Sequence, residues 1–82
     1  MFCDYIISGV QDLRNKVVVE YRFYEGDYIK EGGKMIYKRS AIIDSGRFEM
    51  DESPPDEKHI NKKLKEMLFQ IKGEREVIPE CL

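Results

Sequence analysis

The sequence predicts an α+β fold: an antiparallel sheet of three to four strands, with one C-terminal amphipathic helix packed on one face. Three observations support this. The first half of the chain alternates apolar and polar residues with period two, which is typical of strands. Glycines divide these runs at short intervals, and strands joined by short turns must be antiparallel because a parallel return needs a long crossover. The last third changes to a period of 3.6 residues, which is typical of a helix.

The strand signal is strongest at residues 17–24, where β-branched and aromatic residues dominate. Residues 2–8 alternate in the same way and end at Gly9. Two further runs follow later in the chain, and the second is short. The four predicted strands are therefore 2–8, 17–24, 34–44 and 47–50.

Three turns connect these strands. Asn15 is the predicted turn residue after the first strand because asparagine tolerates positive φ. The pair Gly32–Gly33 predicts a hairpin turn between the second and third strands. Ser45–Gly46 predicts a tight turn into the fourth strand.

The helix is predicted over residues 54–72. Ser53 is the expected N-cap, with Asp56 three positions later, and Gly73 is the expected helix end. Apolar residues recur at i, i+4, i+7, i+8 and i+11, so they share one narrow stripe. These residues are Ile60, Leu64, Met67, Leu68 and Ile71.

One face of the predicted sheet covers this stripe and completes a two-layer core. The face is read from the alternation along each strand. It consists of Cys3, Tyr5, Ile7, Val17, Val19, Tyr21, Phe23, Met35, Tyr37, Ala41, Ile43, Phe48 and Met50.

Length and composition predict one small domain over residues 1–82, with a tail at 74–82 that docks as a short extended piece or frays. Hydrophobic residues at 41% and charged residues at 37% suit a folded chain. No segment approaches a membrane span and no leader precedes the first strand, which predicts a cytoplasmic location, in a cell or in an infected host. Cys3 and Cys81 are therefore expected as reduced thiols, although a bridge between the two ends stays open.

No catalytic constellation is visible in the sequence. His59 is the single histidine, and a Cys3–His59 dyad is the one cysteine nucleophile–base pair to consider. The acids at 49–57 lack the alternating ligands and central glycine of a calcium loop, so they are read as a solvated linker. We therefore expect no enzyme activity, no cofactor and no metal.

The second sheet face is the leading candidate for a binding site. A single helix cannot cover both sides of a sheet, and apolar residues on the uncovered side predict an interface with another protein or with a second copy of the chain. The alternative is ordinary strand propensity on a solvated face. The candidate residues are Ile6, Val18, Glu20, Arg22, Tyr24, Ile36, Lys38 and Ile42.

The outer side of the helix offers the second candidate. Lysines surround one aromatic residue there, an arrangement that could follow a phosphate backbone and stack on a base. It could equally dock an acidic protein surface or remain solvated, and the net charge of −2 argues against a general nucleic-acid binder. This stripe consists of Lys58, Lys62, Lys65, Phe69 and Lys72.

In general character the chain is similar to small phage and mobile-element proteins that block host enzymes through surface contact. The similarity lies in its short length, high charge content and strand-then-helix order, and no motif carries it. It implies an inhibitor of a larger enzyme or complex. The leading hypothesis is thus a protein-binding module, and the alternative is a nucleic-acid-binding module.

Overall fold

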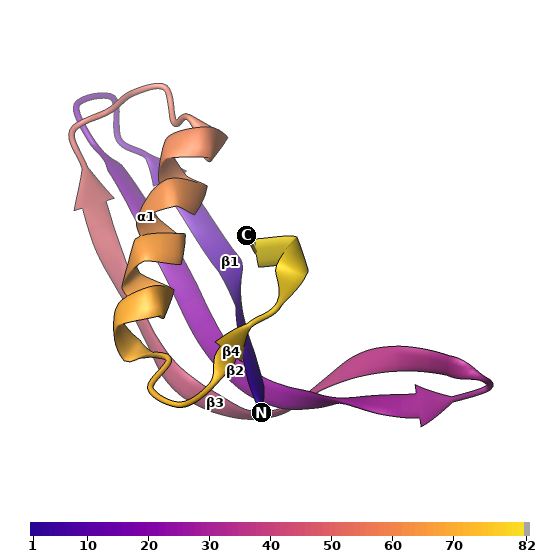
Figure 1. Cartoon of the computed structure of the whole chain (residues 1–82). Coiled ribbons are helices and arrows are strands. Elements are labelled where there is room, and N and C mark those ends of the chain that lie inside the picture. Colours follow the sequence, from indigo (N-terminus) through magenta and orange to yellow (C-terminus); the bar gives the residue numbers. More distant parts are fainter. Residues whose placement is uncertain (82) are drawn as a thin grey trace.

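The fold is α+β, with three long strands, one helix and a short fourth strand (Figure 1). The computed structural model describes residues 1–81. Helix α1 lies across one face of the sheet, and the chain then returns to the first strand. The elements are β1 (Phe2–Asp12), β2 (Val17–Glu31), β3 (Lys34–Met50), α1 (Glu57–Ile71), β4 (Glu76–Val77) and a 3-10 helix, η1 (Pro79–Cys81).

The sheet has the order β3-β2-β1-β4. The first three strands form the expected antiparallel meander. The tail was predicted to dock or fray, and it docks: β4 pairs with β1 in parallel, Phe2 opposite Glu76 and Cys3 opposite Val77. The sheet is therefore mixed rather than wholly antiparallel, and β2, β3 and α1 together form the long connection between β1 and β4 that a parallel pair needs.

The third strand is longer than predicted. Ser45–Gly46 is not a turn but lies inside β3, so the segments 34–44 and 47–50 belong to one strand. Gly46 stands opposite Tyr21, and a Cβ added there would lie 2.9 Å from the Tyr21 hydroxyl oxygen. The glycine therefore makes room for an aromatic side chain across the ladder, which is a role of strand glycines as well as of turn glycines.

The hairpin turn at Gly32–Gly33 is confirmed. Both glycines have positive φ, +58° and +80°, as the preferred two-residue hairpin turns require. In the first turn the positive φ falls on Arg14 rather than on the predicted Asn15. The Asp12 side chain accepts a hydrogen bond from the Arg14 backbone N–H at 3.0 Å, which stabilises that conformation.

The helix begins three residues later than predicted, and its N-cap is Asp56 rather than Ser53. Asp56 accepts from the Lys58 backbone N–H at 2.9 Å. The Ser53 hydroxyl instead donates to Asp12 Oδ1 at 2.6 Å, and Pro54 and Pro55 have no backbone N–H to donate in a first helical turn, so Asp56 takes the role. Gly73, with φ of +61°, follows the last helical turn as expected.

The core lies between α1 and one face of the sheet. It is formed by Cys3, Val17, Val19, Tyr21 and Phe23 from the strands and by Ile60, Leu64 and Leu68 from the helix. Three predicted members are wrong. Met35 and Ala41 are exposed and Tyr37 turns to the opposite side, toward Asp4.

The distal half of the β2–β3 hairpin leaves this core and projects as a two-stranded ribbon (Figure 1). We call residues 26–39 the arm and the rest of the chain the body. The arm makes the molecule elongated, with principal extents of 47 × 26 × 19 Å.

Candidate partner-binding surface

The sheet face opposite α1, here the outer face, carries six of the eight residues predicted for it. Cross-strand partners share a face. Ile6 pairs with Arg22, Tyr24 pairs with Ile42, and Val18 and Glu20 follow the same alternation along β2. The one α-helix within residues 1–81, α1, packs on the other face.

Ile36 and Lys38 do not lie on the outer face. Ser40 is an extra residue in β3, inserted between the pairs Glu25–Ala41 and Gly26–Arg39. Such a bulge reverses the alternation beyond it. It moves Ile36 and Lys38 to the opposite row and brings Arg39 and Tyr37 to the outer side.

The continuous apolar patch predicted from Ile6, Val18, Ile36 and Ile42 is therefore not formed. Val18 is only 7% exposed, and Ile6 is half-buried. Ile42 is 55% exposed, but Glu20 and Arg22 interrupt the surface between the apolar side chains. The outer face is thus a mixed surface with one prominent apolar residue.

The arm carries three of the eight large apolar side chains that are exposed within residues 1–81. Ile29 and Ile36 form a cross-strand pair, and both are exposed. Met35, next to the turn, is 62% exposed. Neither face of the arm is covered by α1, so these side chains are free to contact another molecule.

The charges of the arm are partly neutralised within the chain. Lys38 pairs with Glu31 at 3.0 Å, and Asp27 lies 3.6 Å from the N-terminal amine. Within residues 1–81, no acid lies within ion-pair distance of Lys30 or Lys34. The end of the arm therefore combines exposed apolar side chains with two unpaired positive charges.

A buried carboxylate fixes the base of the arm. Asp4 is 3% exposed and accepts hydrogen bonds from the Arg39 guanidinium and from the Tyr37 hydroxyl, the latter at 3.1 Å. Arg39 also lies over the Tyr24 ring, 4.8 Å from its centroid. Burial, and then the neighbouring Asp4 charge, raise the pKa of Tyr37, so its hydroxyl remains a donor.

Aromatic contacts join the arm to the body, and a second ion pair holds β2 at Glu25, directly before the arm. Phe2 of β1 meets Tyr28 edge to face at 4.9 Å between centroids, and Tyr28 lies 5.6 Å from Tyr37. Arg75, after the helix, donates to Glu25 at 2.6 Å. The direction of the arm is thus set by β1 and by the C-terminal tail, and is not left to the ribbon alone.

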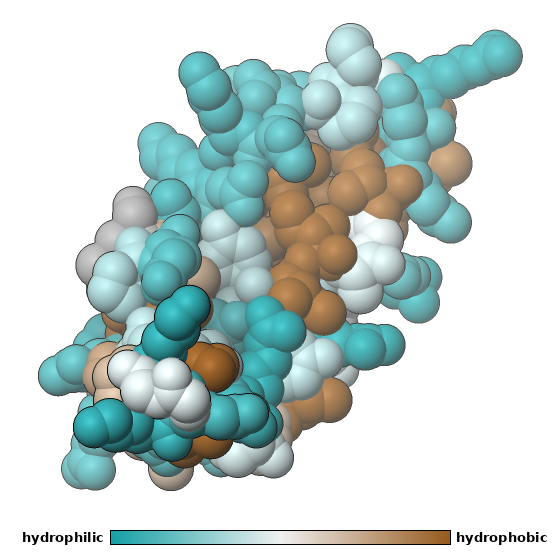
Figure 2. All heavy atoms as spheres, turned by 90° about the vertical axis from the view of Figure 1, so that its right-hand side faces the viewer, coloured by the Kyte–Doolittle hydropathy of each residue, from teal (hydrophilic) through white to brown (hydrophobic). Residues whose placement is uncertain are grey.

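The arm points toward one side of the molecule, and that side of the body is not uniformly polar. Figure 2, viewed from this side, shows a band of hydrophobic residues bordered by hydrophilic ones.

The lysine stripe on α1 is partly formed. Lys58, Lys62, Lys65 and Phe69 line one shallow depression, and Phe69 is 45% exposed. Glu66 lies in the same depression, which reduces its positive charge. The predicted fifth member, Lys72, is half-buried at the C-cap and does not line it.

The two groups considered for nucleophilic chemistry are not brought together. Cys3 is fully buried in the core, and burial raises the pKa of its thiol. His59 is exposed at the start of α1 and pairs with Glu52. Cys81 is buried too, and both cysteines are free thiols here.

No helix in the described part of the chain combines the length and apolarity needed to cross a membrane.

Sequence reasoning missed the arm as a unit. Met35 and Tyr37 were assigned to the core, and Ile36 and Lys38 were assigned to the second sheet face. The one available signal was the strand-like composition on both sides of Gly32–Gly33, which is compatible with a hairpin longer than the core.

Comparison with known proteins gives no relative: no protein family, curated protein or solved structure matches this chain.

Proposed function

We propose that the chain is a non-enzymatic protein-binding module and that the arm is the part that engages the partner. The observation that carries the proposal is the concentration of exposed Ile29, Met35 and Ile36 on a ribbon that projects from the body. Exposed apolar surface of this kind is unfavourable in water and is characteristic of interaction sites.

The partner that fits the arm is a protein with an apolar groove and an acidic rim. The apolar side chains would fill the groove, and each would contribute through the area it removes from water. Lys30 and Lys34, which have no acidic partner within residues 1–81, would face the rim. An arm inserted in this way into the cleft of a larger enzyme would act as an inhibitor.

The junction contacts support this reading because they orient the arm before binding. A ribbon that is already ordered loses less conformational entropy when it docks. The bonds from Arg39 and Tyr37 to Asp4, and the packing of Tyr28 on Phe2, supply that order.

The test places a photo-crosslinking residue at position 35, or at position 69 as a matched control, in the full chain. Both positions carry exposed apolar side chains, one on the arm and one on α1. Each bait is irradiated in extract from the source of the protein. We expect one discrete protein adduct from position 35, which is lost when Ile36→Ser and Lys34→Glu are added to the bait.

The partner in that adduct would then be purified and its affinity measured. We expect Ile36→Ser with Lys34→Glu to weaken binding at least tenfold and Phe69→Ser to leave it unchanged. An adduct from position 69 alone would instead favour the lysine stripe. An adduct to nucleic acid would favour the alternative module, and one to a second copy would indicate a homodimer. Each of these three results overturns the arm proposal.

A further inference from the structure

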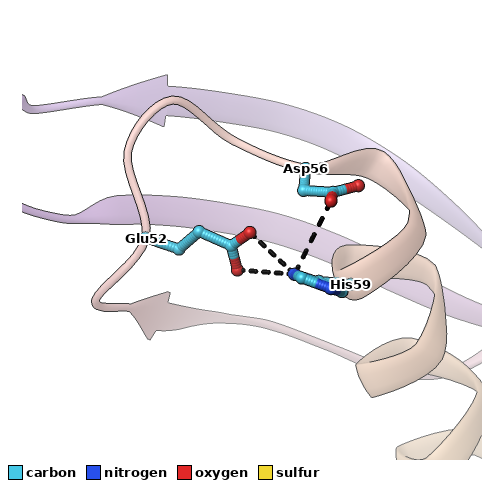
Figure 3. Close-up of side chains that lie close together, drawn as sticks. All are labelled: Glu52, Asp56 and His59. Atoms are coloured by element: carbon cyan, nitrogen blue, oxygen red, sulfur yellow. Dashed lines mark hydrogen bonds and ion pairs between the residues drawn. The ribbon is translucent and has the colours of Figure 1, made fainter.

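Three metal-ligating side chains converge where the linker after β3 enters α1 (Figure 3). Glu52 comes from the linker, Asp56 is the N-cap, and His59 lies in the first turn of the helix. The His59 Nδ1 atom is 2.7 and 2.9 Å from the two Glu52 carboxylate oxygens and 3.7 Å from Asp56 Oδ2. One ligand atom from each residue lies within 4.8 Å of the other two.

Each of the three side chains has one potential ligand atom turned toward the space between them. Asp56 uses Oδ1 to cap the helix, which leaves Oδ2 turned toward His59. Glu52 directs both oxygens at the same ring nitrogen. Two carboxylates and one ring nitrogen therefore face a common point, and a metal ion there would bind Nδ1 in place of a proton.

We propose that Glu52, Asp56 and His59 form a three-ligand site for a divalent transition-metal ion of the zinc type. One imidazole nitrogen and two carboxylate oxygens suit zinc and its neighbours, whereas calcium and magnesium prefer oxygen alone. Tetrahedral zinc with bonds of about 2.0–2.2 Å places its ligand atoms about 3.4 Å apart. The present separations of 2.7 to 3.7 Å from Nδ1 bracket that value, so small side-chain movements complete the geometry.

The surroundings permit this site. His59 is exposed, so water can supply the remaining coordination position. The positive end of the helix dipole opposes a cation at this end of α1, and the two carboxylates offset it. A bound ion would connect the linker to the first turn of the helix and would stabilise the folded state by mass action.

The experiment is a calorimetric titration of the full reduced chain with zinc chloride, and separately with magnesium chloride, in a non-chelating buffer. His59→Gln and Glu52→Gln are the test variants. Glu57→Gln is the matched control, because Glu57 is an exposed acid in the same turn that lies outside the cluster. All three variants retain Cys3 and Cys81, so zinc bound by the thiols would be common to them.

We expect one zinc ion per chain, binding at least tenfold weaker in both test variants, and no change in Glu57→Gln. We also expect zinc to raise the melting temperature of the wild type and of Glu57→Gln but not of His59→Gln. Binding that persists in His59→Gln would overturn the proposal, as would the absence of zinc heat or an equal loss in all three variants. Equal binding of magnesium would overturn it too, because it would indicate a general attraction to acidic surface.

Discussion

The two halves of the β2–β3 hairpin share one hydrogen-bonded ladder but differ in what covers them. In the body, Val17, Val19 and Phe23 are fully or almost fully buried beneath α1. In the arm, Ile29 and Ile36 face each other across the same ladder and remain exposed. Ladder pairing alone therefore does not bury side chains; a second layer does, and the arm keeps its direction through a few contacts at its base.

Truncating a core side chain of α1 should have the largest effect on stability. Leu64→Ala deletes a fully buried side chain in the centre of the core, and we expect a loss of about 3 kcal/mol in unfolding free energy. Met35→Ala on the arm is the control and should change it by less than about 0.5 kcal/mol. Urea unfolding followed by circular dichroism measures both, and equal losses would contradict a division into covered and uncovered halves.

The second-largest loss of stability is expected when a side chain is added at Gly26, where the arm begins. A Cβ at Gly26 would lie 2.1 Å from the Lys38 backbone oxygen, so Gly26→Ala must displace backbone. We expect a loss of about 2 kcal/mol, with amide hydrogen exchange rising mainly in residues 26–39. Gly9→Ala is the control, because the atoms nearest its Cβ all belong to the Glu20 side chain, and the closest is the mobile Oε2 atom at 3.2 Å. Faster exchange across the body instead would show that arm and body are not separable.

Neutralising the buried Asp4 carboxylate should make the arm more mobile. Asp4→Asn weakens the charge-assisted bonds to Arg39, and we expect a loss of roughly 1.5–2 kcal/mol. Trypsin should then cleave faster after Lys30 and Lys34. Asp27→Asn, which affects only an exposed pair with the N-terminus, should leave cleavage unchanged. If trypsin cleaves Asp4→Asn at the wild-type rate, the Asp4 contacts do not hold the arm.

Alkaline pH should destabilise the body by a smaller amount. Burial raises the pKa of Cys3 and of Cys81 above the ordinary value of 9.0. Above that pH the unfolded chain loses these protons while the folded chain keeps them, so stability present below pH 9 is lost as the pH rises. The slope is at most about 1.4 kcal/mol per pH unit for each thiol. Cys81→Ser should reduce this loss of stability, as measured by urea titrations at pH 7, 9 and 10. Stability that rises with pH would contradict the raised pKa of the thiols.

The amphipathic helix, the glycine hairpin turn and the α+β class were predictable because each depends on local periodicity or on φ. The continuity of β3 was not, since the role of Gly46 becomes clear only with Tyr21 opposite it. The N-cap was missed because Ser53 and Asp56 are both good caps, and the Ser53 hydroxyl bonds to Asp12, a contact that the local sequence does not reveal. Burial of the charged Asp4 depends on Arg39 and Tyr37, which are more than thirty residues away.

The candidate site was predictable wherever side chains alternate regularly between the two faces of the sheet. From Val18 to Tyr24 the alternation gives the outer face, as expected. Beyond Ser40 one extra residue reverses it, and no signal for a bulge is visible in the local sequence. The three ligands at 52, 56 and 59 were not grouped from the sequence, because their meeting depends on the path of the linker. The partner-binding role stays a prediction.

The pairing of β1 with β4 sets the order in which the molecule can be completed during synthesis. The Met1 carbonyl accepts from the Glu76 N–H at 3.0 Å, and the Cys3 carbonyl accepts from the Ile78 N–H at 3.1 Å. The first strand thus lacks its last neighbour until nearly the whole described chain has left the ribosome. At about 5–20 residues per second, the arm is made several seconds before that neighbour arrives. A nascent chain would therefore expose its apolar ribbon to chaperones before the body has closed.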